Sequence, residues 1–151
     1  MKPRVYLSAS SAELTRARVA RDALRELGVD VVGAEWIDAV AAHGSLGLGL
    51  PQSQRETIAA GWIDDIRACD VLVALVPCHG VEYEHPSNVS TNRSDGLVSE
   101  VTIARCLGRP VALASRVPRQ RLHPALLCAE WGVHSEDDAA LRAAYRMARR
   151  S

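Results

Sequence analysis

The chain has no net charge, because its 18 basic side chains balance 18 acidic ones. Proteins that bind nucleic acid or anionic membranes usually carry an excess of positive charge, so neither is expected as a partner. Lysine is also scarce: Lys2 is the only one, and the other basic residues are arginines scattered over the predicted helices. We interpret this as a bias of composition and not as a binding surface.

The sequence also lacks a membrane-spanning stretch, a secretory signal and paired cysteines. No apolar stretch approaches the roughly 20 residues needed to cross a bilayer, and the first residues lack the apolar core of a secretory signal. The four cysteines form no CxxC pair. We therefore expect a cytoplasmic protein whose single domain, residues 1–151, is held by a core of Val, Leu, Ile and Ala without disulfides.

Short apolar runs alternate with helical patterns along the sequence. The predicted strands cover 5–7, 29–34, 71–76, 111–114 and 131–133. The predicted helices cover 12–27, 55–68, 136–149 and a segment from 96 or 97 to 107, with a helical turn at 124–130. Such alternation with short connections predicts an α/β fold, a flavodoxin-like three-layer sandwich with a five-stranded parallel sheet.

Residues 35–53 show no clear pattern. A short helix could form at 39–42, but Gly44, Gly47, Gly49 and Pro51 interrupt any regular spacing. We expect a mobile loop here. The glycines do not follow a strand or precede a Lys-Ser/Thr pair, so a phosphate-binding loop is excluded.

Ligands of open α/β sheets bind beyond the carboxyl ends of the strands. Segments 8–11, 35–38 and 77–100 fall there. Within the last of these, Glu100 lies inside the apolar arc of its predicted helix, so that a carboxylate faces the sheet. An unpaired buried carboxylate costs several kcal/mol, which means that Glu100 is paired, hydrogen-bonded or functional.

Two interpretations of Glu100 stay open at this point. Its predicted place in the first helical turn lets the helix dipole favour the anion, which suits a nucleophile. The alternative is an ordinary first-turn glutamate or an ion pair with an arginine. A capping box is not supported, because position 97 is Leu and not Ser or Thr.

Three stretches of the sequence carry a resemblance to a known family. They are VYLSA at 5–9, IRACDVLV at 66–73 and DGLVSEVTIA at 95–104, the last running into GRPV at 108–111. With these stretches the chain resembles the nucleoside 2-deoxyribosyltransferase family and its relatives that hydrolyse nucleoside or nucleotide N-glycosidic bonds. The resemblance covers most of residues 4–115 and places Glu100 on the nucleophile.

The resemblance implies an enzyme that acts like a retaining glycosidase. Glu100 would attack C1′ of a ribosyl or deoxyribosyl group, and a second base or water would resolve the glycosyl-enzyme. The first expectation is a transferase acting on a nucleoside or deoxynucleoside, and the alternative is a hydrolase of nucleoside 5′-monophosphates. A non-catalytic nucleotide-binding module on the same fold is the further alternative. The resemblance also implies a homo-oligomer, a dimer or higher, because relatives complete each pocket with a neighbouring subunit.

The sequence departs from the family at the residue that usually contacts the base. An aspartate is usual there, and this chain has Trp62. Asp65 is the better substitute, because it lies on the flank of the apolar arc whereas Asp64 points away from it. The second catalytic residue is therefore expected to be Asp65. A proton for the leaving base could also come from Asp95 or a histidine at 79 or 85.

The remaining expected site residues contact the substrate. Tyr6, Ser8 and Ser10 would form the pocket floor and bind sugar or phosphate, the alternative being strand packing and a helix cap. Trp36 would stack on the base, or else close an edge of the core. The full set of expected substrate-binding residues is Tyr6, Ser8, Ser10, Trp36, Ser94, Asp95 and Gly96.

No cofactor or metal is expected. Cys78, His79, Glu84 and His85 include residue types that bind zinc, but their spacing matches no usual pair of ligands.

Overall fold

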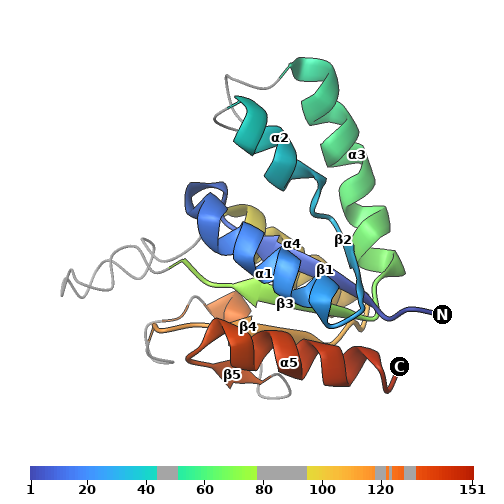
Figure 1. Cartoon of the computed structure of the whole chain (residues 1–151), viewed down its shortest axis with the longest axis vertical. Helices are drawn as coiled ribbons and strands as arrows, with labels where there is room; N and C mark the ends of the chain where they lie inside the picture. The colour runs from blue at the N-terminus through green and yellow to red at the C-terminus, as the bar shows by residue number, and fades with distance from the viewer. Residues whose placement is uncertain (44–50, 78–94, 118–121, 123, 128–131) are drawn as a thin grey trace.

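The strands form one parallel sheet. The computed structural model describes residues 1–43, 51–77, 95–117, 122, 124–127 and 132–151. Among these residues the order in the sheet is β2-β1-β3-β4-β5, with every neighbouring pair parallel (Figure 1). The strands are β1 (Arg4–Ala9), β2 (Asp30–Val32), β3 (Val71–Leu75), β4 (Val111–Ala114) and β5 (Val133–His134). This order confirms the predicted flavodoxin-like sheet.

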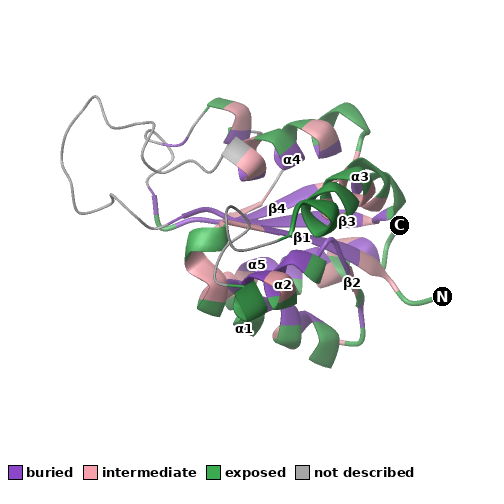
Figure 2. Ribbon diagram, turned by 90° about the horizontal axis from the view of Figure 1, so that it is seen from above, coloured by how far each residue is buried: buried purple, intermediate pink, exposed green. Residues whose placement is uncertain are grey.

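Helices cover both faces of the sheet, which gives the predicted three layers. They are α1 (Leu14–Glu26), α2 (Glu35–His43), α3 (Gln52–Ala68), α4 (Asp95–Cys106) and α5 (Asp137–Ala148), with 3-10 turns at Ser11–Glu13 and Pro124–Leu126. Figure 2 shows α1, α2 and α5 on one side of the sheet and α3 and α4 on the other. No helix in the described part of the chain is long and apolar enough to span a membrane.

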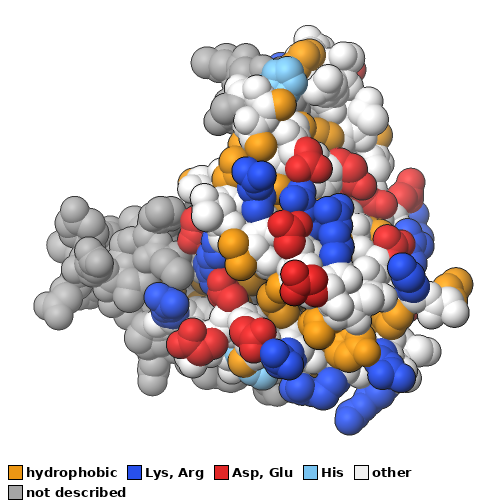
Figure 3. Space-filling view, in the orientation of Figure 1, with side chains coloured by type: hydrophobic (Ala, Val, Ile, Leu, Met, Phe, Trp, Pro, Cys, Tyr) orange, Lys and Arg blue, Asp and Glu red, His pale blue; other side chains and the backbone are white. Residues whose placement is uncertain are grey.

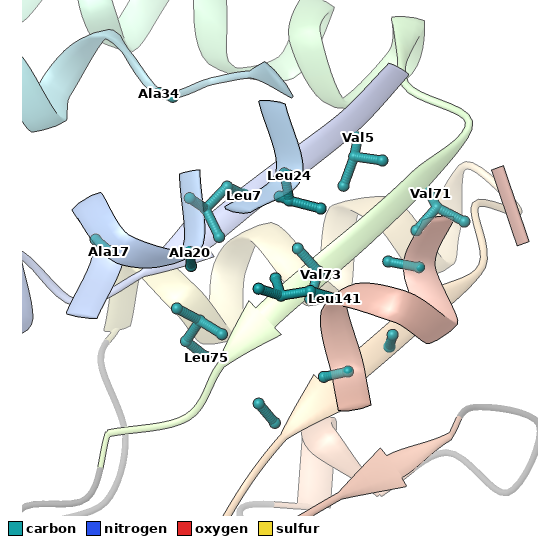
Figure 4. Close-up of a cluster of buried hydrophobic side chains, with 14 of the residues drawn as sticks. Val5, Leu7, Ala17, Ala20, Leu24, Ala34, Val71, Val73, Leu75 and Leu141 are labelled. Atoms are coloured by element: carbon teal, nitrogen blue, oxygen red, sulfur yellow. The ribbon is translucent and has the colours of Figure 1, made fainter. Parts of the chain in front are cut away.

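The alternation of side chains along each strand divides the core in two. Val5, Leu7 and Val73 point to the face under α1 and α5, where they pack with Leu24 and Leu141 (Figure 4). The other positions of the same strands, among them Tyr6, point to the face under α3 and α4. Polar site residues of β1 therefore lie on one defined side of the sheet.

The prediction of a mobile loop at 35–53 was wrong in its first part. Residues Glu35–His43 form α2, because Trp36, Ile37 and Val40 fall on one helical face and bury themselves in the core. The stability gained by burying these side chains outweighs the helix-breaking tendency of the glycines that follow. Those glycines lie at 44–50, outside the described residues. The second strand is correspondingly shorter than predicted.

Charged side chains of both signs are interleaved across the centre of the face drawn in Figure 3. One arginine, Arg16, joins three elements. Its guanidinium makes two hydrogen bonds to Asp137, of 2.8 and 2.7 Å, and donates to the carbonyl oxygen of Val76 at 2.6 Å. Glu13 adds an ion pair at 3.0 Å. Arg16 thus joins α1, the start of α5 and the end of β3.

We expect Arg16→Ala to lower the free energy of unfolding by about 2–3 kcal/mol, since it leaves partly buried acceptors without their charged donor. The matched control is Arg142→Ala, because Arg142 pairs with Asp138 of α5 in an exposed i,i+4 pair. Its loss is expected to cost about 0.5 kcal/mol or less. Urea unfolding of both variants measures the difference, and equal losses would contradict a role for Arg16 in joining these elements.

Candidate active site

A cavity of about 340 Å³ opens beside the carboxyl end of β1. Its walls come from the end of β1, the segment between β2 and α2, the inner face of α3 and the start of α4. The lining residues are Ala9, Ser11, Gly33, Glu35, Trp36, Arg55, Ile58, Ala59, Trp62, Asp65, Gly96, Leu97 and Glu100. Its place next to the point where strand order reverses, between β1 and β3, is the place where ligands bind in such folds.

Glu100 contributes a buried carboxylate to this cavity. Its residue is 7% exposed, and Leu97, Val101 and Ala104 beside it are fully packed. The oxygen Oε1 accepts a hydrogen bond of 3.2 Å from the hydroxyl of Tyr6. The other oxygen, Oε2, is buried and has no hydrogen-bond partner. No ion pair joins Glu100 to an arginine of the described part of the chain.

Burial governs the protonation of Glu100. Desolvation raises the pKa of its carboxyl from 4.5 to about 7, and the polar groups of Ser8, Trp62 and Tyr6 oppose this rise in part. The prediction that Glu100 lies in the first helical turn was wrong, because α4 begins at Asp95 and places Glu100 in the second turn. There the helix dipole is weaker, which leaves burial as the dominant influence.

Tyr6 and Ser8 lie beneath Glu100 on the same face of β1. Burial, followed by the charge of Glu100, raises the pKa of the Tyr6 hydroxyl well above its usual range, so that this group stays a proton donor. The Ser8 hydroxyl is buried and, like Oε2 of Glu100, lacks a hydrogen-bond partner. A buried carboxylate oxygen and a nearby buried hydroxyl, both without a hydrogen-bond partner, are unusual in a packed core.

The inner face of α3 forms one wall of the cavity. Arg55, Ile58, Trp62 and Asp65 line it at helical spacing. Of the 17 residues of α3, Ile66 alone is fully buried. Ile63, by contrast, is 48% exposed and is not among the residues that line the cavity.

Asp65 and Asp64 occupy different surroundings. Asp65 is half-buried at the cavity, where desolvation and then the charge of Glu35 raise its pKa. Asp64 is exposed and pairs with Arg67 at 2.7 Å. The helix therefore brings Asp65 to the cavity and turns Asp64 to the surface.

The other expected binding residues divide between the cavity and its surroundings. Trp36 and Gly96 line the cavity, and Trp36 also belongs to the core under α1. Ser10 caps the following 3-10 turn by accepting from the Ala12 N–H at 3.3 Å, and Ser11 lines the cavity in its place. Ser94 and the side chain of Asp95 lie outside the described residues.

The residues considered for zinc, and the histidines at 79 and 85, also lie outside the described residues. Among the residues that are described, no group of three or more His, Cys, Asp or Glu could hold a metal ion.

Gly33 and Arg55 line the cavity but were not among the site residues expected from the sequence. A signal for Gly33 was available, because a glycine at the end of a strand often marks a left-handed backbone or a close approach. Arg55 could have been found from its spacing of seven residues to Trp62 and ten to Asp65, which places all three near one face of a helix.

Comparison with known proteins finds solved structures that share the fold. Neither family models nor curated proteins gave a match. A 2-deoxyribosyltransferase from the psychrotolerant bacterium Bacillus psychrosaccharolyticus matches with a TM-score of 0.57 at 15% identity, over 96% of this chain and 95% of that one. The chain shares the fold of this enzyme.

Two further structures agree. A conserved protein from Enterococcus faecalis V583 matches over 100% of both chains, with a TM-score of 0.58 and 17% identity. The CMP N-glycosidase BcmB of Clostridium botulinum matches over 93% of this chain and 96% of that one, with a TM-score of 0.50 and 15% identity. The fold implied by the sequence resemblance is thereby confirmed, and at these identities it is the fold that is shared.

We expect Glu100→Gln to stabilise the protein at high pH. Because the pKa of Glu100 is higher in the folded chain than in the unfolded one, its favourable contribution is full below pH 4.5 and is lost as the pH rises to about 7. The rise in pKa corresponds to about 3 kcal/mol. The variant should therefore exceed the wild type in stability above pH 7, by an amount that shrinks as the pH falls. Urea unfolding between pH 5 and 8 tests this, and a difference independent of pH would contradict it.

Proposed function

We propose that the chain is an enzyme that cleaves the N-glycosidic bond of a nucleoside or nucleotide, with Glu100 as its nucleophile. The observation that carries the proposal is the buried carboxylate of Glu100, which lines a cavity and has one oxygen free of any hydrogen bond. A charge held in this way is costly, and such cost is typical of catalytic groups. The fold shared with a 2-deoxyribosyltransferase and a CMP N-glycosidase gives further support.

The geometry suggests how each group acts. Tyr6 holds Oε1 and fixes the orientation of the Glu100 carboxylate, which supplies the attacking oxygen. A bond forms between a carboxylate oxygen of Glu100 and C1′ while the bond from C1′ to the base nitrogen breaks, and the electron pair of the broken bond leaves with the base. Asp65, whose pKa is raised, supplies a proton to that base. Water or a second base then attacks C1′ and gives a proton to the Asp65 carboxylate, while the bond between C1′ and the Glu100 oxygen breaks and its electron pair returns to the Glu100 carboxylate.

The cavity suits a substrate of this class. Its volume of about 340 Å³ lies within the usual range for small-molecule pockets, roughly 300–1,000 Å³. Trp36 and Trp62 line it from α2 and α3, and indole rings stack well on flat aromatic groups. The aspartate usual in the family at Trp62 is thus replaced by a stacking surface, with an acid one helical turn further along.

A nucleoside 5′-monophosphate hydrolase is the second candidate. Arg55 favours it, because this guanidinium is the one cation among the described lining residues and no described acid pairs with it. A phosphate dianion would complement the charge. A non-catalytic nucleotide-binding module stays the alternative that a complete absence of cleavage would favour.

The homo-oligomer and the cytoplasmic location stay predictions. Ile63 is a large apolar side chain exposed on α3 beside Trp62, and a subunit interface on this helix would cover it.

We expect Glu100→Ala to abolish cleavage, because the attacking oxygen is removed. The loss should exceed about a thousandfold in kcat/KM, as for other removed nucleophiles. Release of free base from a panel of nucleosides and 5′-monophosphates measures it. Asp64→Asn is the matched control, since this carboxylate lies on the outer face of α3, and it should retain activity within about twofold. Full activity in Glu100→Ala would remove the proposed mechanism.

We expect Arg55→Ala to discriminate between phosphorylated and free substrates. Loss of a charged contact should raise KM for a 5′-monophosphate about tenfold. The KM of the corresponding nucleoside should stay within about twofold, because it presents no anion to Arg55. Steady-state kinetics with both members of a nucleoside and nucleotide pair measures the two effects. Equal changes for both substrates would contradict a phosphate contact at Arg55.

A further inference from the structure

Gly33 occupies a position at which no side chain fits. Its φ is +69°, a left-handed conformation that other residues rarely adopt. A Cβ atom added there would lie 2.2 Å from Cε2 of Tyr6 and 2.7 Å from both Cδ2 and Cζ. Gly28 and Gly108 have similar φ values of +82° and +66°, but a Cβ on either would meet nothing within 4 Å. The close approach to Tyr6 therefore distinguishes Gly33 from glycines that share its backbone conformation.

The ring of Tyr6 has little room to move away. Tyr6 is 1% exposed and belongs to the buried cluster that includes Ile66, Leu72 and Leu97. Its hydroxyl is held at the other end by Oε1 of Glu100. A side chain at position 33 would push the ring or the end of β2 aside, and either movement changes the distance from the Tyr6 hydroxyl to Glu100.

We propose that Gly33 is a positioning residue for the Glu100 nucleophile and acts through Tyr6. The inference rests on the proposed function of Glu100. The missing side chain lets the Tyr6 ring lie against the end of β2, and in this position its hydroxyl reaches Oε1 and fixes the orientation of the carboxylate. Gly33 thus links the end of β2, through the Tyr6 ring, to the orientation of the carboxylate in α4.

Three variants test the link through catalysis. Tyr6→Phe removes the hydroxyl alone and should lower kcat about tenfold to a hundredfold, the range expected for a lost hydrogen bond to a charged group. Gly33→Ala should lower kcat to a similar extent with a smaller change in KM. The double variant Tyr6→Phe with Gly33→Ala should be as active as Tyr6→Phe alone. Both changes remove the same interaction, the hydrogen bond from the Tyr6 hydroxyl to Glu100, so their effects should not add.

Gly28→Ala is the matched control, since it imposes a similar backbone strain without the contact, and it should keep kcat within about twofold. Additive losses in the double variant, or an unchanged kcat in Tyr6→Phe, would overturn the proposal.

A second measurement needs no substrate. The carboxyl titration of Glu100, followed by NMR and assigned with Glu100→Gln, should move to higher pH in Tyr6→Phe and in Gly33→Ala, since the carboxylate loses a donor. The double variant should titrate like Tyr6→Phe. This pattern without any glycosidic cleavage would refute the proposed function and retain the positioning role. An unshifted titration in Gly33→Ala would overturn that role.

A third comparison tests the proposal if the Gly33→Ala variant does not fold. Tyr6→Leu removes Cε2 and Cζ, two of the three atoms that a Cβ at position 33 would meet. If Gly33→Ala does not fold, its combination with Tyr6→Leu should fold as well as Tyr6→Leu alone. A double variant that stays unfolded while Tyr6→Leu folds would show that the ring contact is not the reason for the glycine, and the proposal would fall.

Discussion

The structure around the cavity depends on one contact, the hydrogen bond from the Tyr6 hydroxyl to the buried carboxylate of Glu100. It joins the first strand to the fourth long helix across 94 positions of sequence. A carboxylate with little water around it needs such a donor, because desolvation favours its neutral form. The contact supplies one donor and leaves the second oxygen without any. Burial of the Glu100 carboxylate with only one hydrogen bond therefore lowers the stability of the fold. The same carboxylate lines the cavity.

The fold could be predicted almost completely because its signals are local. Continuous apolar runs such as 71–76 mark strands buried on both faces, and helical spacing between them marks the crossovers. The failure at α2 has a physical cause. The helix α2 is stabilised by burial of Trp36, Ile37 and Val40 against α1. This contribution comes from tertiary packing, which the local sequence pattern does not reveal. Boundaries elsewhere shifted by a few residues at helix and strand ends.

The site could be predicted only in outline. Periodicity placed Glu100 on a buried face and Asp65 at the flank of its helix, and both line the cavity. Contacts between segments that are distant in the sequence could not be predicted from periodicity. The approach of Gly33 to Tyr6 depends on how β2 and β1 lie side by side, and the exchange of Ser10 for Ser11 depends on which serine caps the turn. Such details are set by three-dimensional packing and not by spacing along the chain.

The scant burial of α3 has a consequence for how a ligand would affect the whole protein. A helix of 17 residues with one fully buried side chain takes little stability from the core, and much of its inner face borders the cavity. A molecule bound there would provide the apolar partner that this face lacks. Occupancy would then be thermodynamically linked to the order of the helix, with local opening of α3 suppressed in proportion to ligand concentration. In this respect a bound ligand would act as a structural partner of α3.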